Sequence, residues 1–355
     1  MMGVGKMGVQ LGPLIVKKVI NLRDLEGRVL AVDASSILYQ FLSLIRYPDG
    51  TPLMDGHGHV TSGLVGLFYR SSRLIYEYGI PMAFVFDGKR PEIKFSWLTE
   101  EEREKRERQR EKTIREWREA VERRDLATAY SKAVTTGRLD SQVISDAKRL
   151  LDLMGVPWIQ APSEAEAQAA YMAKEGAAWA SNSGDYDSLL FGTPRMARYI
   201  SIAGKYRNVW MPSKPEIIEL DRFLRALRIK HEQLIDLALL IGTDYNRGIK
   251  GIGPKRALAL VRRYGMIENI PSSIIAQFND DLATIRAAFM KPNVTGGYKI
   301  EFKPIDREGI VRFLCDERQF DEGKVLSGLR KMRKAHPQQE GQTSLLDWTG
   351  RMDRG

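Results

Sequence analysis

Short apolar runs alternate with longer amphipathic stretches between Val29 and Gly192, a pattern typical of an α/β fold. Runs this short, rich in Val, Ile and Phe, fit strands that are buried on both faces of a parallel sheet. The sequence therefore predicts a central, mostly parallel sheet flanked by helices. The predicted strands are Val29–Val32, Ala83–Phe86, Val156–Gln160, one that begins at Trp179–Ala180, and one at Tyr199–Ile202.

The stretches between these strands have helical spacing of their apolar residues. They predict helices from about Ser35 to Leu44, at Leu64–Tyr78 and at Glu164–Lys174, whereas Asp49–His59 is rich in Gly, Asp and Pro and is expected to be a loop. From about Lys214 the pattern becomes helical. After Lys334 the periodicity is lost, so we expect one folded unit over 1–335 and a flexible tail over 336–355.

A charged insertion interrupts the α/β pattern between Thr99 and Arg124, where Glu, Arg and Lys interleave in EEEREKRERQREKTIREWRE. Opposite charges at this spacing support i,i+4 pairs along a long exposed helix. Two interpretations remain open. The helix is either a solvated arm or a basic-faced element that contacts phosphates.

The charge balance favours a polyanionic partner. Lys and Arg number 55 against 45 Asp and Glu, which makes the net charge +10, although ribosome-associated and merely soluble basic proteins have similar values. The single cysteine, Cys315, excludes an internal disulfide framework and a Cys-based zinc site, and fits a reducing cytoplasm. The chain contains no apolar run long enough to cross a bilayer and no signal-peptide pattern.

Seven carboxylates lie where strands or helices are predicted to end or begin. Each alone has a structural explanation: Asp33 can cap a helix, Asp87-Gly88 is a common turn pair, and Ser163 with Glu166 fits a capping box. Residues past the strand ends of an open parallel sheet converge in one crevice, however, and clustered acids repel one another unless cations neutralise them. The seven are Asp33, Asp87, Glu164, Glu166, Asp185, Asp187 and Asp244.

Such an acid cluster predicts a divalent metal site. Magnesium prefers oxygen ligands, and two ions can activate a water and stabilise the leaving oxygen in phosphodiester hydrolysis. Lys89 or Lys94 would stabilise charge on the scissile phosphate, although either can equally be a surface lysine. None of the four histidines lies in a nucleophile context, and the N-terminal GVGK lacks the complete phosphate-loop pattern.

A glycine-rich turn separates two predicted helices in GIKGIGPKRAL, Gly248–Leu258. Gly248, Gly251 and Gly253 would expose backbone N–H groups to phosphate oxygens, and Lys255 and Arg256 then begin the next helix. This arrangement binds a duplex backbone without reading its sequence. The alternative is a plain joint between two helices with a glycine cap.

Five motifs in a fixed order carry a family resemblance: VDASSILYQFL, FVFDGKRP, QAPSEAEAQAAYM, GDYDSLLFG and IGTDYNRGIKGIGPKRAL, preceded by MGVQLGPLI from Met7. The chain resembles the archaeal-type flap endonucleases of the XPG-like structure-specific 5′ nuclease family. The resemblance implies a PIN-like nuclease fold in a single nuclease domain over 1–335. It also implies a helical arch at about 95–135 and a helix–two-turn–helix at about 230–265.

The resemblance also implies an activity. Members are magnesium-dependent endonucleases that cut DNA near the junction of a 5′ flap and duplex in Okazaki-fragment maturation and repair, and 5′–3′ exonuclease activity is expected too. Two Mg²⁺ ions are implied, with Mn²⁺ as a substitute and a K⁺ ion at the helix–two-turn–helix. The expected partners are branched DNA and a PCNA-type sliding clamp, for a monomer in the archaeal cytoplasm at the nucleoid.

Residue roles follow from the matched motifs. Lys94 matches the family's catalytic lysine, and Arg103 is our choice for its arch arginine. The tail resembles a clamp-binding peptide with Gln342, Leu345 and Trp348 as the inserted residues. The acids divide into a first metal group, Asp33, Asp87, Glu164 and Glu166, and a second group, Asp185, Asp187 and Asp244.

Three positions depart from the family pattern. The family begins Met-Gly-Val, which here corresponds to Met7, so either translation starts there or the extension crowds the active site. Gly184 replaces the usual Glu or Gln before the first aspartate of DYD, which would loosen that loop. Thr349 stands where the clamp motif has a second aromatic residue, so we expect weakened but real clamp binding.

Two other functions remain open. One is a related 5′ nuclease that prefers bubbles, four-way junctions or exonucleolytic ends. The other is a non-catalytic DNA-junction binder recruited by the clamp. The full charged insertion and the tail motif favour the flap enzyme over the first, and the complete set of seven acids argues against the second.

Overall fold

A seven-stranded sheet organises the chain, and the computed structural model describes residues 8–134, 136–137, 139–200, 205–206, 209–210, 214–275 and 281–335. The strand order is β1–β9–β6–β5–β2–β3–β4. From β6 to β4 all neighbours are parallel, whereas β9 runs antiparallel to β6 and to β1. The predicted mostly parallel sheet is confirmed. Its strands are β1 (Lys18–Val19), β2 (Leu30–Asp33), β3 (Met82–Phe86), β4 (Trp158–Gln160), β5 (Ala180–Asn182), β6 (Arg195–Arg198) and β9 (Glu216–Glu219).

Two sequence predictions about strands are wrong. The strand expected at Tyr199–Ile202 does not form at Tyr199 and Ile200, because β6 spans Arg195–Arg198 and the next residue, Tyr199, has φ +60°, whereas residues 201 and 202 lie outside the described part of the chain. The chain also does not turn helical at Lys214, because Glu216–Glu219 forms β9 first. Only two apolar residues mark that strand, and its first residue is a buried glutamate that pairs with an arginine of β6 and with Lys17.

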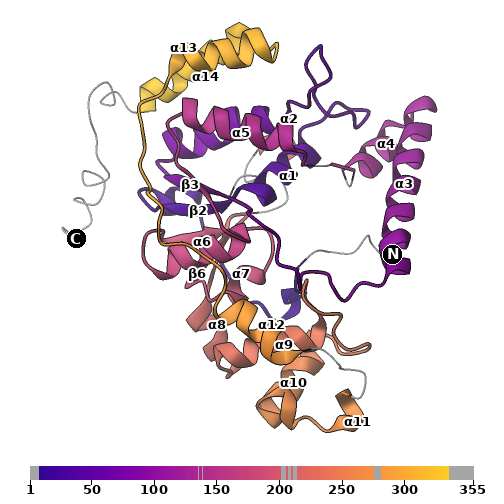
Figure 1. Cartoon of the computed structure of the whole chain (residues 1–355). Coiled ribbons are helices and arrows are strands. Elements are labelled where there is room, and N and C mark those ends of the chain that lie inside the picture. The colour runs from indigo at the N-terminus through magenta and orange to yellow at the C-terminus, as the bar shows by residue number, and fades with distance from the viewer. Residues whose placement is uncertain are drawn as a thin grey trace, which may run out of the picture.

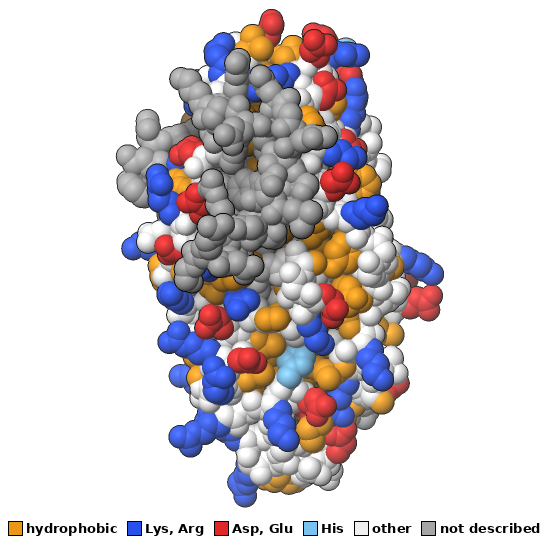
Figure 2. All heavy atoms as spheres, turned by 90° about the vertical axis from the view of Figure 1, so that its left-hand side faces the viewer, with side chains coloured by type: hydrophobic (Ala, Val, Ile, Leu, Met, Phe, Trp, Pro, Cys, Tyr) orange, Lys and Arg blue, Asp and Glu red, His pale blue; other side chains and the backbone are white. Residues whose placement is uncertain are grey.

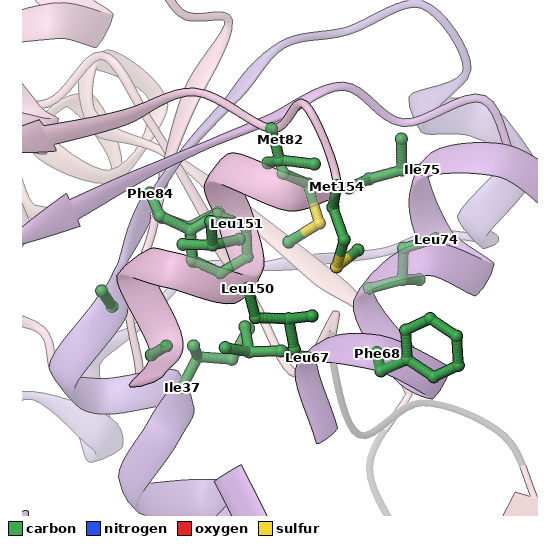
Figure 3. Close-up of a cluster of buried hydrophobic side chains, with 14 of the residues drawn as sticks. Ile37, Leu67, Phe68, Leu74, Ile75, Met82, Phe84, Leu150, Leu151 and Met154 are labelled. Atoms are coloured by element: carbon green, nitrogen blue, oxygen red, sulfur yellow. The ribbon is translucent and has the colours of Figure 1, made fainter. Parts of the chain in front are cut away.

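Helices cover both faces of the sheet (Figure 1). Along β2 and β3 alternate residues face opposite sides, so each face has its own apolar cluster. One cluster packs the sheet against α1 (Ala34–Leu44) and α5 (Ser141–Leu153), and the other packs it against α6 (Ala165–Lys174). Figure 3 shows the first cluster, in which Ile37, Leu67, Phe84, Leu150 and Met154 meet.

The helix predicted at Leu64–Tyr78 is confirmed as a helical segment. It begins as α2 (Ser62–Val65) and continues through two wide-turned, π-helical stretches, η3 (Gly66–Ser71) and η4 (Arg73–Glu77). Buried Leu67 and Phe68 anchor it to the cluster of Figure 3. The C-terminal elements lie at the same end of the molecule as this segment, at the top of Figure 1. They are α13 (Arg307–Val311), η6 (Arg312–Glu317) and α14 (Glu322–Ala335).

A second helical layer occupies the opposite end of the molecule (Figure 1). Its core includes Phe223, Leu237 and Phe289, all fully buried. Figure 2 shows Lys and Arg side chains spread over one face of the molecule, several of them along its lower left edge, with Asp and Glu side chains among them. The elements are α7 (Asp187–Leu190), α8 (Leu220–Leu227), α9 (His231–Ile241), α10 (Pro254–Tyr264), η5 (Ile267–Asn269), α11 (Ser272–Ile275) and α12 (Leu282–Met290).

The charged insertion forms a helical arm that stands beside the body at the right of Figure 1. It consists of α3 (Glu100–Glu122) and α4 (Leu126–Ala133), which pack on each other. Thr99 and Glu102 form a capping box at the start of α3, and Arg108 pairs with Glu104 at 2.9 Å across one turn. The predicted long exposed helix is confirmed. The remaining short elements are η1 (Gly12–Leu14), η2 (Leu22–Leu25), β7 (Lys205–Tyr206) and β8 (Val209–Trp210).

Candidate active site

The carboxyl ends of the parallel strands bring the predicted acids together. Asp33 is the last residue of β2 and caps α1, accepting a hydrogen bond from the Ser36 amide at 3.0 Å. Asp87 directly follows β3. One of its oxygens accepts from the Ala165 amide at 2.8 Å, and the other accepts from the Ser35 hydroxyl. Asp87 therefore ties the start of α1 to the start of α6.

The two glutamates at the start of α6 point into the same crevice. Glu164 accepts hydrogen bonds from the Lys94 ammonium group and the Tyr245 hydroxyl, and Glu166 accepts one from the Ser183 hydroxyl. The capping box suggested by Ser163 and Glu166 is wrong, because the helix begins one residue later and its cap makes no side-chain hydrogen bond. Glu166 is thus available for another role.

The beginning of the described chain closes the far side of the crevice. The Val9 amide donates to Asp187 at 2.8 Å, and the Gly8 amide donates to Asp244 at 3.3 Å. Gly8 has φ +80°, and a side-chain carbon there would lie 3.0 Å from Cβ of Asp185. Only glycine fits this position without strain. The N-terminal segment therefore packs directly on three of the seven acids.

Burial and mutual repulsion disfavour the charged forms of four acids. Burial, reinforced by neighbouring carboxylates, raises the pKa of Asp33 to about 7 and the pKa of Asp187 to about 7. The same causes raise the pKa of Asp185 to about 6 and hold the pKa of Glu166 well above its ordinary value. Additional positive charge is needed for all four to be ionised together at neutral pH.

Lys94 supplies part of that positive charge. Its ammonium group pairs with Glu164 and lies 3.3 Å from an Asp244 oxygen. Burial by itself lowers the pKa of Lys94, but the two carboxylates outweigh burial and raise it. The next residue, Phe95, adopts φ +62° and donates its amide to the Asp244 carbonyl at 2.7 Å. This strained backbone fixes the point where Lys94 enters the crevice.

The other two predicted basic residues lie outside the cluster. The Lys89 side chain is 86% exposed and lies 4.0 Å from Glu92. Arg103 lies on the first turn of α3 and donates to the Phe95 carbonyl at 3.4 Å. Neither makes a hydrogen bond or ion pair with one of the seven acids in the part of the chain that the structure describes.

The donor set fits magnesium in its chemistry. All seven groups are carboxylates, the ligands that this hard cation prefers. A cation among them would stabilise the charged forms of the four acids whose pKa values are raised. Among the described residues, no three acidic, His or Cys side chains are already arranged to hold one ion. Magnesium keeps several waters and does not need an all-protein cage, so the acids can bind it through fewer direct contacts.

The predicted glycine-rich turn lies between α9 and α10. Gly248 and Gly251 have φ +72° and +84°, which side chains rarely adopt, and a side-chain carbon on Gly251 would project into open space. Ile249 and Ile252 are buried in the hydrophobic core of the second helical layer and anchor the turn there. Gly253 precedes the first helical residue of α10. Exposed Lys255 and Arg256 follow on that first turn.

Several residues around the crevice were not found from the sequence. The Trp97 indole donates to the Asp244 carbonyl at 3.2 Å, and Arg247 pairs with Glu102, which links the glycine-rich turn to the base of the arm. Tyr245 was missed although it adjoins Asp244 in the IGTDYN motif. Apart from this adjacency, nothing in the sequence indicated that its hydroxyl donates a hydrogen bond to Glu164. The tail residues Gln342, Leu345 and Trp348, with Thr349 and Met7, lie outside the described residues.

The comparison with known proteins identifies the family. Residues 2–113 match the XPG N-terminal domain and residues 155–244 match the XPG I-region. Flap endonuclease 1 of Thermococcus onnurineus is 47% identical over 350 residues, which cover 97% of this chain and all of the relative. The chain belongs to the flap endonuclease 1 family. Flap endonuclease 1 of Pyrococcus furiosus is likewise 47% identical, over 93% of this chain and 96% of the relative.

Solved structures support the same assignment. Flap endonuclease-1 from Methanococcus jannaschii matches with a TM-score of 0.72 and 39% identity over 92% of this chain and 98% of that one. The catalytic core of Rad2 in complex with DNA substrate has a TM-score of 0.67 at 22% identity, covering 91% and 97% of the two chains, and shows the shared fold. The predicted resemblance and nuclease fold are therefore confirmed. As a flap endonuclease family member, the chain is a nuclease, and metal dependence is general in the family.

Across the described part of the chain, no helix combines the length and the apolar character that crossing a bilayer requires.

Proposed function

We propose that the chain hydrolyses a phosphodiester bond of branched DNA near the junction of a 5′ flap and duplex, by two-magnesium catalysis. The observation that carries this proposal is the convergence of seven acids from five separate segments around one crevice that already contains Lys94. Acids this close destabilise the fold unless cations neutralise them, and a metal-dependent nuclease needs such a group of acids to hold its ions.

The acids divide by position. When bound, the ions supply a water of lowered pKa and stabilise charge on the leaving oxygen. Manganese has the same preference for oxygen ligands and is expected to substitute. We assign the first ion to Asp33, Asp87, Glu164 and Glu166, and the second to Asp185, Asp187 and Asp244.

The three basic residues near the crevice have different roles in this proposal, according to their distance from the acids. Lys94 exchanges its carboxylate partners for the scissile phosphate when DNA binds, and stabilises the charge that develops there. Arg103, at the base of α3, approaches the same phosphate from the arm. Exposed Lys89 contacts the strand at the entrance to the crevice and not the reacting phosphate.

The body holds the duplex and the arm admits the single strand. Gly248, Gly251 and Gly253 present backbone N–H groups to one duplex strand, with Lys255 and Arg256 beside them and a K⁺ ion coordinated at the turn. The arch over about 95–135 then surrounds the 5′ single strand. We treat 1–335 as one nuclease unit with the helix–two-turn–helix at about 230–265.

The tail recruits the enzyme to its substrate in this proposal. Gln342, Leu345 and Trp348 bind a PCNA-type sliding clamp, weakly because Thr349 replaces an aromatic residue. The monomer then acts at the nucleoid in Okazaki-fragment maturation and repair, with 5′–3′ exonuclease activity as a secondary reaction.

The deciding experiment is magnesium-dependent cleavage of a labelled double-flap DNA, with Asp187→Ala and a chelator as controls. We expect cutting at the flap base that both controls abolish, while Asp187→Ala still binds the DNA. Bubble, gap and four-way-junction substrates run in parallel separate a flap enzyme from its relatives. Adding a PCNA-type clamp should stimulate cutting by wild type more than by Trp348→Ala.

Other outcomes have defined meanings. Binding without cutting by the full chain, but cutting by a chain that starts at Met7, means that the N-terminal extension crowds the site. Binding without cutting by both chains means a non-catalytic junction binder. Cleavage that persists in rigorously purified Asp187→Ala contradicts the metal assignment.

A further inference from the structure

The loop that presents two of the seven acids begins at Gly184, and its backbone is held from both sides. The Gly184 amide donates to the Ser36 hydroxyl at 3.3 Å. The Gly184 carbonyl accepts from the Arg198 guanidinium at 2.8 Å. Contacts from α1 and β6 therefore hold the backbone at Gly184, the position where the sequence led us to expect a looser loop.

Arg198 makes further contacts with the same loop. Its guanidinium donates to the Tyr186 hydroxyl at 2.6 Å and lies 4.1 Å from the centre of the Tyr186 ring. Tyr186 stands between Asp185 and Asp187 in the sequence. One guanidinium therefore fixes the backbone before the first acid and the side chain between the two.

A buried ion pair keeps Arg198 in this orientation. Arg198 is the last residue of β6, and Glu216 of the neighbouring antiparallel strand β9 accepts from it at 3.1 Å. Lys17 pairs with the other Glu216 oxygen at 2.6 Å. Arg198 is 7% exposed and Glu216 is 2% exposed. Burying such a pair contributes little net stability to a fold, so its clearest effect is to orient the loop.

We propose that Arg198 is a positioning residue of the nuclease site, which holds the Gly184–Asp187 loop so that Asp185 and Asp187 face the metal ions. The proposal rests on the metal-dependent cleavage proposed above. In this proposal Arg198 contacts neither the substrate nor the metal ions. It acts through the Gly184 carbonyl and the Tyr186 hydroxyl, and Glu216 acts through Arg198.

The test uses the full chain with Arg198→Met and a matched control, Arg195→Met. Arg195 begins the same strand, but its guanidinium lies over the Trp179 ring at 5.2 Å and makes no contact with the loop in the described structure. Calorimetric titration with Ca²⁺ in the absence of DNA measures metal affinity. The magnesium concentration for half-maximal flap cleavage and the DNA affinity in chelator are measured on the same samples.

For Arg198→Met we expect Ca²⁺ affinity to fall by about tenfold and the half-saturating magnesium concentration to rise by a similar factor, as when groups that orient metal ligands are removed. DNA affinity in chelator should be unchanged. Arg195→Met should match wild type in all three measurements. Glu216→Gln should shift metal affinity in the same direction by less, because it leaves Arg198 present but less firmly held.

Arg198→Lys covers the case in which Arg198→Met fails to fold. Lysine keeps the charge but cannot donate to the carbonyl, the hydroxyl and the glutamate in one fixed plane, so metal affinity should still fall. The proposal is overturned if a folded Arg198→Met, or failing that Arg198→Lys, binds Ca²⁺ as wild type does. A wild-type enzyme that cuts no flap DNA with magnesium would instead overturn the proposed function.

Discussion

At the scale of single residues, Lys94 occupies the place of a cation among the acids. Its ammonium group pairs with Glu164 and approaches Asp244, although one acid is assigned to each metal group. A buried lysine paired in this way offsets part of the repulsion between carboxylates. In the proposed mechanism it also competes with the metal ions for the same oxygens, so Lys94 would exchange partners before cleavage.

Replacing Lys94 by Met should therefore have opposite effects on binding and on chemistry. Without DNA, Ca²⁺ affinity measured by calorimetry should rise by at least about threefold, because a competing unit charge a few ångströms away is removed. Flap cleavage should fall by about 10²–10³-fold, the usual cost of losing one group that stabilises the transition state.

Lys89→Met is the matched control, since that side chain is 86% exposed and, among the described residues, forms an ion pair only with Glu92. It should leave both Ca²⁺ affinity and the cleavage rate near wild type. Weaker Ca²⁺ binding in Lys94→Met would show that the lysine organises the acids and does not compete with the metal.

At the scale of elements, the turn between α9 and α10 combines rigid backbone with exposed charge. Positive φ angles at Gly248 and Gly251 and the buried anchors Ile249 and Ile252 hold it, so its N–H groups point in fixed directions. Lys255 on the first turn of α10 makes no ion pair with any described residue. Such a surface suits a phosphate backbone and carries no base-specific information.

Lys255→Ala should weaken the binding of every duplex-containing substrate to a similar extent. The slope of log affinity against log salt should fall in magnitude by about one, because one phosphate contact is lost. Fluorescence anisotropy in chelator, over a range of salt concentrations and two unrelated duplex sequences, measures both quantities.

Arg263→Ala tests whether position on the helix matters, because Arg263 is also exposed but lies at the opposite end of α10. It should change the salt slope less than Lys255→Ala does. A Lys255→Ala variant that alters the preference between the two duplex sequences would mean that the turn reads bases.

At the scale of the whole molecule, the acid crevice costs the fold stability until cations bind. Burial raises the pKa of Asp187 to about 7, above the value of about 4 expected in an unfolded chain. The folded state therefore holds a proton that the unfolded state releases between these values. The resulting penalty grows as the pH rises from about 4 to about 7 and is constant above that.

Asp187→Asn should therefore raise the melting temperature of the chelated protein, and raise it more at pH 8 than at pH 5.5. Magnesium should stabilise the wild type by at least about 2 °C at pH 8 and the variant by less, because a ligand is missing. Differential scanning fluorimetry of both proteins, in EDTA at pH 5.5 and pH 8 and in Mg²⁺ at pH 8, measures these melting temperatures. Equal melting temperatures of both proteins in EDTA at pH 8 would contradict the inferred repulsion.

The sequence by itself determined the main architecture and the members of the acid set. Apolar runs predicted β2, β3 and β4 to within about two residues. The signal is strongest for β2 and β3, because every residue of these two strands is buried and a strand buried on both faces needs a continuous apolar run. Asp33 and Asp87 follow from those strands, since parallel strands end at one edge. The glycines between α9 and α10, and the basic residues that begin α10, could also be recognised from the local sequence.

Only the tertiary structure decided which charged residues lie inside. Nothing in the local sequence separates Lys94, which enters the crevice, from Lys89, which faces solvent, because the strained backbone at Phe95 sets the direction. Strand β9 and the pairing of Arg198 with Glu216 were likewise invisible, since a buried charge is tolerated only when a partner from a distant strand is present. Long-range pairing, which leaves no periodic signal in the chain, therefore places the groups that hold the acids.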